Sequence, residues 1–116
     1  MTPEEFQKLV NKALCGLPKV FKEKIENVDI VVEVWPRAEF AQGRLLLGLY
    51  QGVPKTTWGR NLGVTIPDKI TIFQGPIEWL ARGDEQRTIE LVIDTVEHEI
   101  AHHFGISDSR LAELKR

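Results

Sequence analysis

The sequence contains a single cysteine, Cys15, among its 116 residues. It therefore cannot form an internal disulfide or a cysteine-based zinc site, and this usage fits a reducing compartment. Basic residues are not in excess either, because Lys and Arg total 15 against 17 Asp and Glu, for a net charge of −2. This balance argues against a nucleic-acid partner, which requires a strongly basic surface.

Long hydrophobic runs are also missing, since none approaches the roughly 18 residues that cross a bilayer. No membrane partner is therefore expected. Residues 1–5 are acidic and lack the basic and then apolar order of a signal peptide. Together these absences predict a cytoplasmic protein of bacterial type. The length, with 42% hydrophobic and 28% charged residues, predicts one globular domain over residues 1–116.

Helical spacing and strand-forming residues follow one another along the chain and predict an α+β fold. Residues 3–15 are expected to form a helix, with Thr2 as its N-cap and Pro3 at the first helical position. Strands are predicted at 28–35, 45–52 and 69–73, a loop at 55–68, and further helices at 18–25, 76–81, 84–104 and 108–115. The helix 84–104 has an apolar stripe and a second face with histidines, which indicates a central position in the fold.

All three histidines of the chain lie within residues 98–103, in the pattern H-E-x-x-H-x-x-G-x-x-D. His98 and His102 are one helical turn apart, so both imidazoles leave the same face and can bind one zinc ion. Gly105 can adopt a positive φ and turn the chain, which can bring Asp108 to the same ion as a third ligand. Three protein ligands leave a fourth position for water, as in a catalytic zinc site.

Glu99 directly follows the first histidine and is rotated around the helix away from the metal. Its carboxylate can reach a metal-bound water and deprotonate it as a general base. The alternative interpretation is a helix with two exposed histidines and a glycine C-cap, but a pattern of this length rarely occurs by chance. His103 points about 100° away from His102 and is expected to pack or to support the site.

Several other residues are candidates on weaker patterns. Tyr50, the only tyrosine, could donate to a developing oxyanion, although a half-buried packing role is favoured. Asp94 could orient His98 as an acceptor, or it could face solvent. Trp58 and Arg60, in the glycine-rich loop, could contact a substrate, although a solvated Arg60 is favoured. Trp35 and Trp79 are expected in the core, and Cys15 is expected to pack on or beside the apolar face of its helix.

Beyond the motif, roughly residues 45–114 resemble a family of short bacterial zincin-like metallopeptidases. The resemblance is carried by the motif at 98–108, the G-L-Y-x-G-V-P segment at 48–54, the segment 67–73 and the tail 110–114. It implies a minimal zincin fold with a small sheet, an N-terminal helix and a long active-site helix. It also implies that His98, His102 and Asp108 bind one zinc ion and that Glu99 is the base.

These observations predict a zinc-dependent peptidase that acts on a peptide or protein substrate. Glu99 would take a proton from the attacking water and pass it to the leaving amine. Residues 45–51 are the candidate edge strand with which an extended substrate pairs. The alternative is a non-enzymatic metal-binding interaction domain with the same fold. A metal-dependent nuclease is a third possibility, but the chain lacks the basic surface that it requires.

Overall fold

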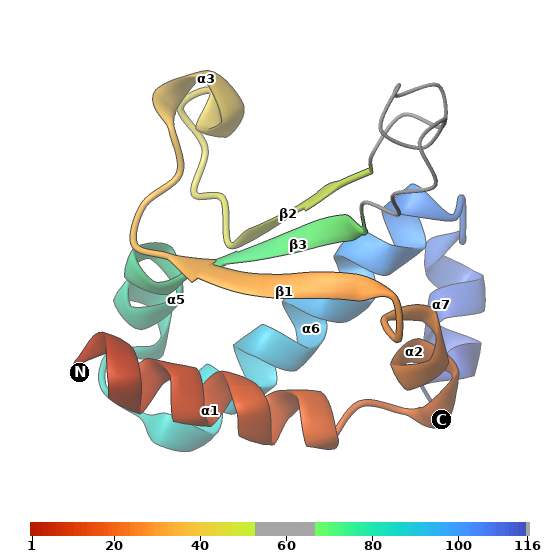
Figure 1. The fold of residues 1–116 in the computed structure, drawn as a ribbon, viewed down its shortest axis with the longest axis horizontal. Helices are drawn as coiled ribbons and strands as arrows, with labels where there is room; N and C mark the ends of the chain where they lie inside the picture. The colour runs from red at the N-terminus through yellow and green to blue at the C-terminus, as the bar shows by residue number, and fades with distance from the viewer. Residues whose placement is uncertain (53–66, 116) are drawn as a thin grey trace, which may run out of the picture.

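The computed structural model describes residues 1–52 and 67–115. In this part of the chain, α1 and α6 lie on one side of a three-stranded sheet and α3 lies on the other (Figure 1). The elements are α1 (Pro3–Cys15), α2 (Lys19–Lys24), β1 (Val28–Glu33), α3 (Ala38–Ala41), β2 (Gly48–Gln51), β3 (Asp68–Phe73), α5 (Gln74–Ala81), α6 (Glu85–His103) and α7 (Asp108–Leu114).

The predicted α+β class and the predicted strands and helices are confirmed, with end points shifted by a few residues. The short helix α3 was not predicted. The predicted loop 55–68, including Trp58 and Arg60, lies almost wholly outside the described residues. None of the described helices is long and apolar enough to span a membrane.

The sheet has the order β1-β3-β2, with β1 parallel to β3 and β2 antiparallel to it. Ile70 and Ile72 of the central strand are fully buried, and both contribute to the core. Strand β2 pairs only with β3 among the described residues, so its outer edge is free of other strands in this part of the chain and is called its free edge below. This is the position that the sequence predicted for residues 45–51.

Helix α1 forms where its caps and its apolar spacing agree. Thr2 Oγ1 accepts a hydrogen bond from the Glu5 backbone N–H at 3.1 Å, and Pro3 occupies the first turn, which needs no donor there. The residues of the apolar face are buried: Phe6, Leu9, Val10 and Ala13. Cys15 is exposed, so its predicted packing role is wrong. It lies about 200° around the helix from Ala13, on the face away from the core.

Helix α6 crosses beneath the sheet and is the central element of the core (Figure 1). Asp84 Oδ1 accepts a hydrogen bond from the Arg87 backbone N–H at 3.0 Å and thereby caps the helix start. The buried residues of the helix are Thr88, Leu91, Val92, Thr95, Val96, Glu97, Ile100 and Ala101, which supports the predicted central position, although the histidines of the predicted second face are exposed. Because the helix has buried residues along most of its length, the exposed motif at its C-terminal end rests on a rigid support.

Two tryptophans predicted to lie in the core are exposed instead, Trp35 at 58% and Trp79 at 62%. Strand β1 ends at Glu33, so Trp35 lies beyond the pleated register that would turn it towards the helices. Its ring covers Gly75, where an added Cβ would lie 2.4 Å from Trp35 Cε2. Trp79 occupies the outer face of α5, whose inner face buries Ile77.

Gly48 is a point of close approach between β2 and α6. A Cβ at this position would lie 2.4 Å from Thr95 Cγ2 and 3.0 Å from the Thr71 carbonyl oxygen. The absence of a side chain therefore allows the edge strand to lie directly on the motif helix.

Substituting Gly48 by Ala is expected to lower the free energy of unfolding by about 1–3 kcal/mol, because the methyl group overpacks this contact. Urea denaturation measures the change. Gly16→Ala is the matched control, since a Cβ there would have no neighbour nearer than 3.4 Å. An equal loss in both variants would contradict the close approach at Gly48.

Candidate metal centre and catalytic base

His98 and His102 lie in the last turns of α6, and both are exposed. His98 Nδ1 lies 2.7 Å from the backbone carbonyl oxygen of Asp94. With the proton on Nδ1 this is an N–H···O bond, which orients the ring and leaves Nε2 available for a metal. The contact that orients His98 therefore comes from the Asp94 carbonyl group, whereas the Asp94 carboxylate, which the sequence offered as one of two alternatives, lies 3.5 Å from Lys115 Nζ.

The chain turns sharply after α6, as the glycine in the motif predicted. Gly105 has a φ of 68°, and the Ile106 backbone N–H donates to the Ala101 carbonyl at 2.8 Å. This is a Schellman ending of the helix, which requires a left-handed residue that glycine adopts without strain. Ser107 then caps α7 through its hydroxyl, so that Asp108 lies in the first turn of that helix.

The three predicted metal ligands line the same hollow, which has a volume of about 440 Å³. His98 and His102 contribute from α6, and Asp108 contributes from α7, together with Leu111, Ala112 and Lys115. Within residues 1–52 and 67–115, no three His, Cys, Asp or Glu side chains form a group that could hold a metal ion. The predicted ligands thus share one hollow but are not closed around a common point.

Glu99 points to the sheet and not into that hollow. Its Oε1 accepts a hydrogen bond from the Tyr50 backbone N–H of β2 at 2.9 Å. Glu99 and His98 also line a second hollow of about 330 Å³, which runs beside Leu46, Leu47 and Gly48. The predicted base therefore lies between the motif helix and the edge strand.

The Tyr50 side chain contacts both Asp68 and His103. Its hydroxyl donates to Asp68 Oδ2 at 2.7 Å, and its ring stacks on His103 with 3.9 Å between centroids. Burial, and then Asp68, raises the pKa of the Tyr50 hydroxyl to about 12. Because the hydroxyl is already bonded to Asp68, these contacts support the packing role for Tyr50 and for His103.

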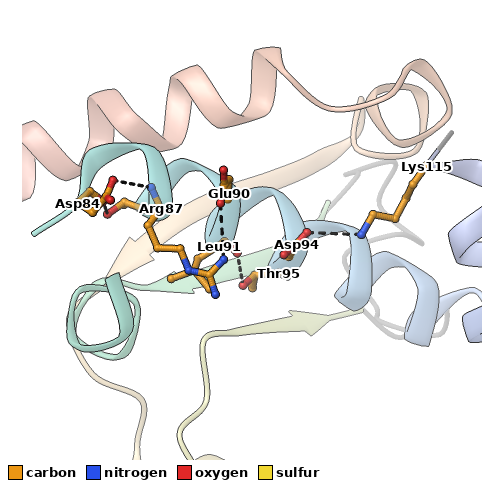
Figure 2. A network of polar contacts seen from close by, with 8 residues as sticks. Asp84, Arg87, Glu90, Leu91, Asp94, Thr95 and Lys115 are labelled. Atoms are coloured by element: carbon orange, nitrogen blue, oxygen red, sulfur yellow. Dashed lines mark hydrogen bonds and ion pairs between the residues drawn. The ribbon is translucent and has the colours of Figure 1, made fainter. Parts of the chain in front are cut away.

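A buried carboxylate next to the motif forms an ion pair that was not predicted from the sequence. Glu97 is only 1% exposed, and its Oε1 lies 3.3 Å from Lys115 Nζ at the end of α7. The same Nζ lies 3.5 Å from Asp94 Oδ1. Figure 2 draws this contact as a dashed line. Lys115 therefore ties α7, which carries Asp108, to the motif helix.

Burial and charge have opposite effects on the pKa values of this pair. Burial raises the pKa of the Glu97 carboxyl, and Lys115 offsets this increase only in part. Desolvation lowers the pKa of the Lys115 ammonium, but Glu97 and Asp94 together raise it above its ordinary value. Lys115 therefore favours the ionised form of Glu97, whereas burial favours the protonated form.

Lys115→Met is expected to lower the free energy of unfolding at pH 7 by about 1–3 kcal/mol, because it leaves a buried carboxylate without its cation. The loss shrinks as the pH falls through the raised pKa of Glu97, since the protonated carboxyl needs no counter-charge. Denaturation at several pH values measures both effects. Arg110→Met is the control, because Arg110 pairs with Glu113 on the surface of the same helix. A loss independent of pH would contradict the assignment.

Comparison with protein families gives a match that covers the sheet and the helix with the motif. Residues 25–116 match the model of the zincin-like metallopeptidase family. The chain belongs to this family. The match covers the sheet, the motif helix and α7, and of the described elements it leaves only α1 and α2 outside. Comparison with curated proteins gives no match.

Proposed function

We propose that this protein is a zinc-dependent peptidase. The observation that carries the proposal is that two histidines and an aspartate from adjoining helices line one hollow, beside a glutamate under a free strand edge. Family membership supports a metallopeptidase. The proposal assigns His98, His102 and Asp108 to the metal and Glu99 to proton transfer.

The chemistry of the donor set fits zinc. Two imidazoles and one carboxylate are common zinc ligands, and the Asp94 carbonyl leaves Nε2 of His98 available. The three side chains must close around the ion, which requires movement within the hollow they already share. When bound, zinc would polarise the scissile carbonyl and lower the pKa of the attacking water.

The chain itself supplies proton transfer and alignment of the substrate. Glu99 takes the proton of the attacking water on its carboxylate and delivers it to the nitrogen of the leaving amine. The hollow beside Leu46, Leu47 and Gly48 can hold an extended peptide against the edge of β2. A peptide in this hollow would have its scissile bond next to the Glu99 carboxylate.

Cleavage of a peptide library by the purified protein tests this function. Zinc-loaded protein is expected to cut extended peptides, a chelator is expected to stop cleavage, and added zinc is expected to restore it. No cleavage, or cleavage that the chelator leaves unchanged, would contradict the proposal. If zinc binds stoichiometrically and no peptide is cut, the metal-binding interaction domain becomes the better account.

Removal of zinc is expected to leave a cooperative thermal unfolding transition. The core is built from buried side chains of α1, β3, α5 and α6, and it does not depend on the predicted ligands, which are exposed. Zinc should raise the melting temperature by linkage, because it binds the folded state. Calorimetry with chelator and then with zinc measures both. Loss of the transition in chelator would instead indicate a structural metal.

A further inference from the structure

The backbone of β2 alternates between pairing with β3 and facing the free edge. The Phe73 N–H donates to the Leu47 carbonyl at 2.9 Å, and Leu49 and Gln51 lie opposite Thr71 and Lys69 in the register. In an antiparallel pair, bonded and non-bonded positions alternate. Tyr50 is therefore a non-bonded position, and its N–H points away from β3 towards the free edge.

This outward N–H has an acceptor, and that acceptor is the predicted base. Glu99 Oε1 lies 2.9 Å from the Tyr50 nitrogen. The close packing of Gly48 on Thr95 holds the strand at this distance from α6. Glu99 thus accepts the hydrogen bond from the Tyr50 N–H, which a strand added to β2 would otherwise accept.

The hollow along this edge indicates which segment could be added. It is lined by the apolar side chains Leu46, Leu47 and Leu91, and by the polar side chains Asp94, Thr95, His98 and Glu99. An extended peptide could place an apolar side chain against these leucines while its backbone passes the Tyr50 N–H.

We propose that an extended peptide with an apolar side chain pairs with β2 and that its backbone carbonyl replaces Glu99 as acceptor of the Tyr50 N–H. The exchange conserves one N–H···O bond and releases the carboxylate. Glu99 is consequently free to move a proton only while a peptide strand lies on the edge. The role of the released carboxylate in proton transfer rests on the proposed function. The replacement of Glu99 by a peptide carbonyl does not.

Hydrogen exchange of the Tyr50 amide, measured by NMR on the full chain, tests the resting contact. Glu99→Ala removes the acceptor, so exchange at Tyr50 should accelerate about 10-fold or more, as expected for loss of a bond to a charged group. Glu99→Gln keeps a side-chain oxygen and should leave most of the protection in place. Unchanged exchange at Tyr50 in Glu99→Ala would overturn the proposal.

Titration with a blocked hexapeptide of alternating Leu and Thr tests the replacement. Binding should shift the ¹³C resonance of the Glu99 carboxyl in the unmodified protein and should restore protection of the Tyr50 amide in Glu99→Ala. The same peptide with Pro at each Thr position cannot form a ladder and should do neither. Absence of binding, or binding that leaves both signals unchanged, would overturn the proposal.

The two proposals fail in different ways. If zinc-dependent cleavage occurs but hydrogen exchange of the Tyr50 amide is unchanged in Glu99→Ala, the proposed replacement of Glu99 by a peptide carbonyl is wrong and the peptidase proposal is retained. If the Tyr50 amide and Glu99 carboxyl signals respond as expected but no peptide is cut, the replacement of the acceptor is retained and the peptidase proposal is wrong.

Discussion

Glu99→Gln is expected to lower peptide turnover by about 10²–10⁴-fold, the range associated with a positioned general base, while zinc content stays nearly unchanged. Glutamine keeps the size of the side chain and an oxygen for the Tyr50 N–H, but it cannot accept the proton of the attacking water. Metal analysis and initial rates on one cleaved peptide measure the two quantities.

Glu90→Gln is the matched control for this variant. Glu90 lies on the same helix and pairs with Arg87 on the surface at 3.6 Å, remote from the motif. Its substitution should leave turnover unaltered. If Glu99→Gln cleaves at the rate of the unmodified protein, Glu99 is not the base. If it changes only the affinity for a partner, the interaction domain is the better account.

His98→Ala and His102→Ala are each expected to abolish stoichiometric zinc binding. Each variant removes one of two imidazoles that line the same hollow, and a remaining histidine with one aspartate is a poor zinc site. Dialysis against buffer of low free zinc, followed by metal analysis, measures the loss.

The third histidine provides the control for these substitutions. His103 stacks on Tyr50 and does not line the hollow with Asp108. His103→Ala should therefore retain zinc while losing some stability. Full zinc content in both His98→Ala and His102→Ala would place the metal elsewhere.

Local signals explain why most elements could be predicted from the sequence. Thr2 and Pro3 begin α1 through their own backbone and side-chain preferences, and Gly105 ends the motif helix by its access to positive φ. Such effects act over a few residues, so their sequence spacing is informative. The motif at 98–108 is local in the same sense, and the structure gathers its predicted ligands around one hollow.

Contacts between distant segments could not be predicted in this way. Tyr50 and Glu99 are 49 positions apart, and nothing in either segment indicates that a backbone amide meets that carboxylate. Glu97 lies among charged residues on a helix, and only tertiary packing buries it against Lys115. Trp35 was misassigned because aromatic residues favour burial on average, whereas its position depends on where β1 ends.

The central claim is that one zinc ion is held by His98, His102 and Asp108 with a position left for water. Anomalous diffraction at the zinc edge from crystals of the zinc-loaded protein tests this claim most directly. The account predicts one peak within bonding distance of both imidazoles and the Asp108 carboxylate, at roughly 2.0–2.2 Å, with no fourth protein ligand. A peak at other residues, or a shell closed by four protein ligands, would contradict it.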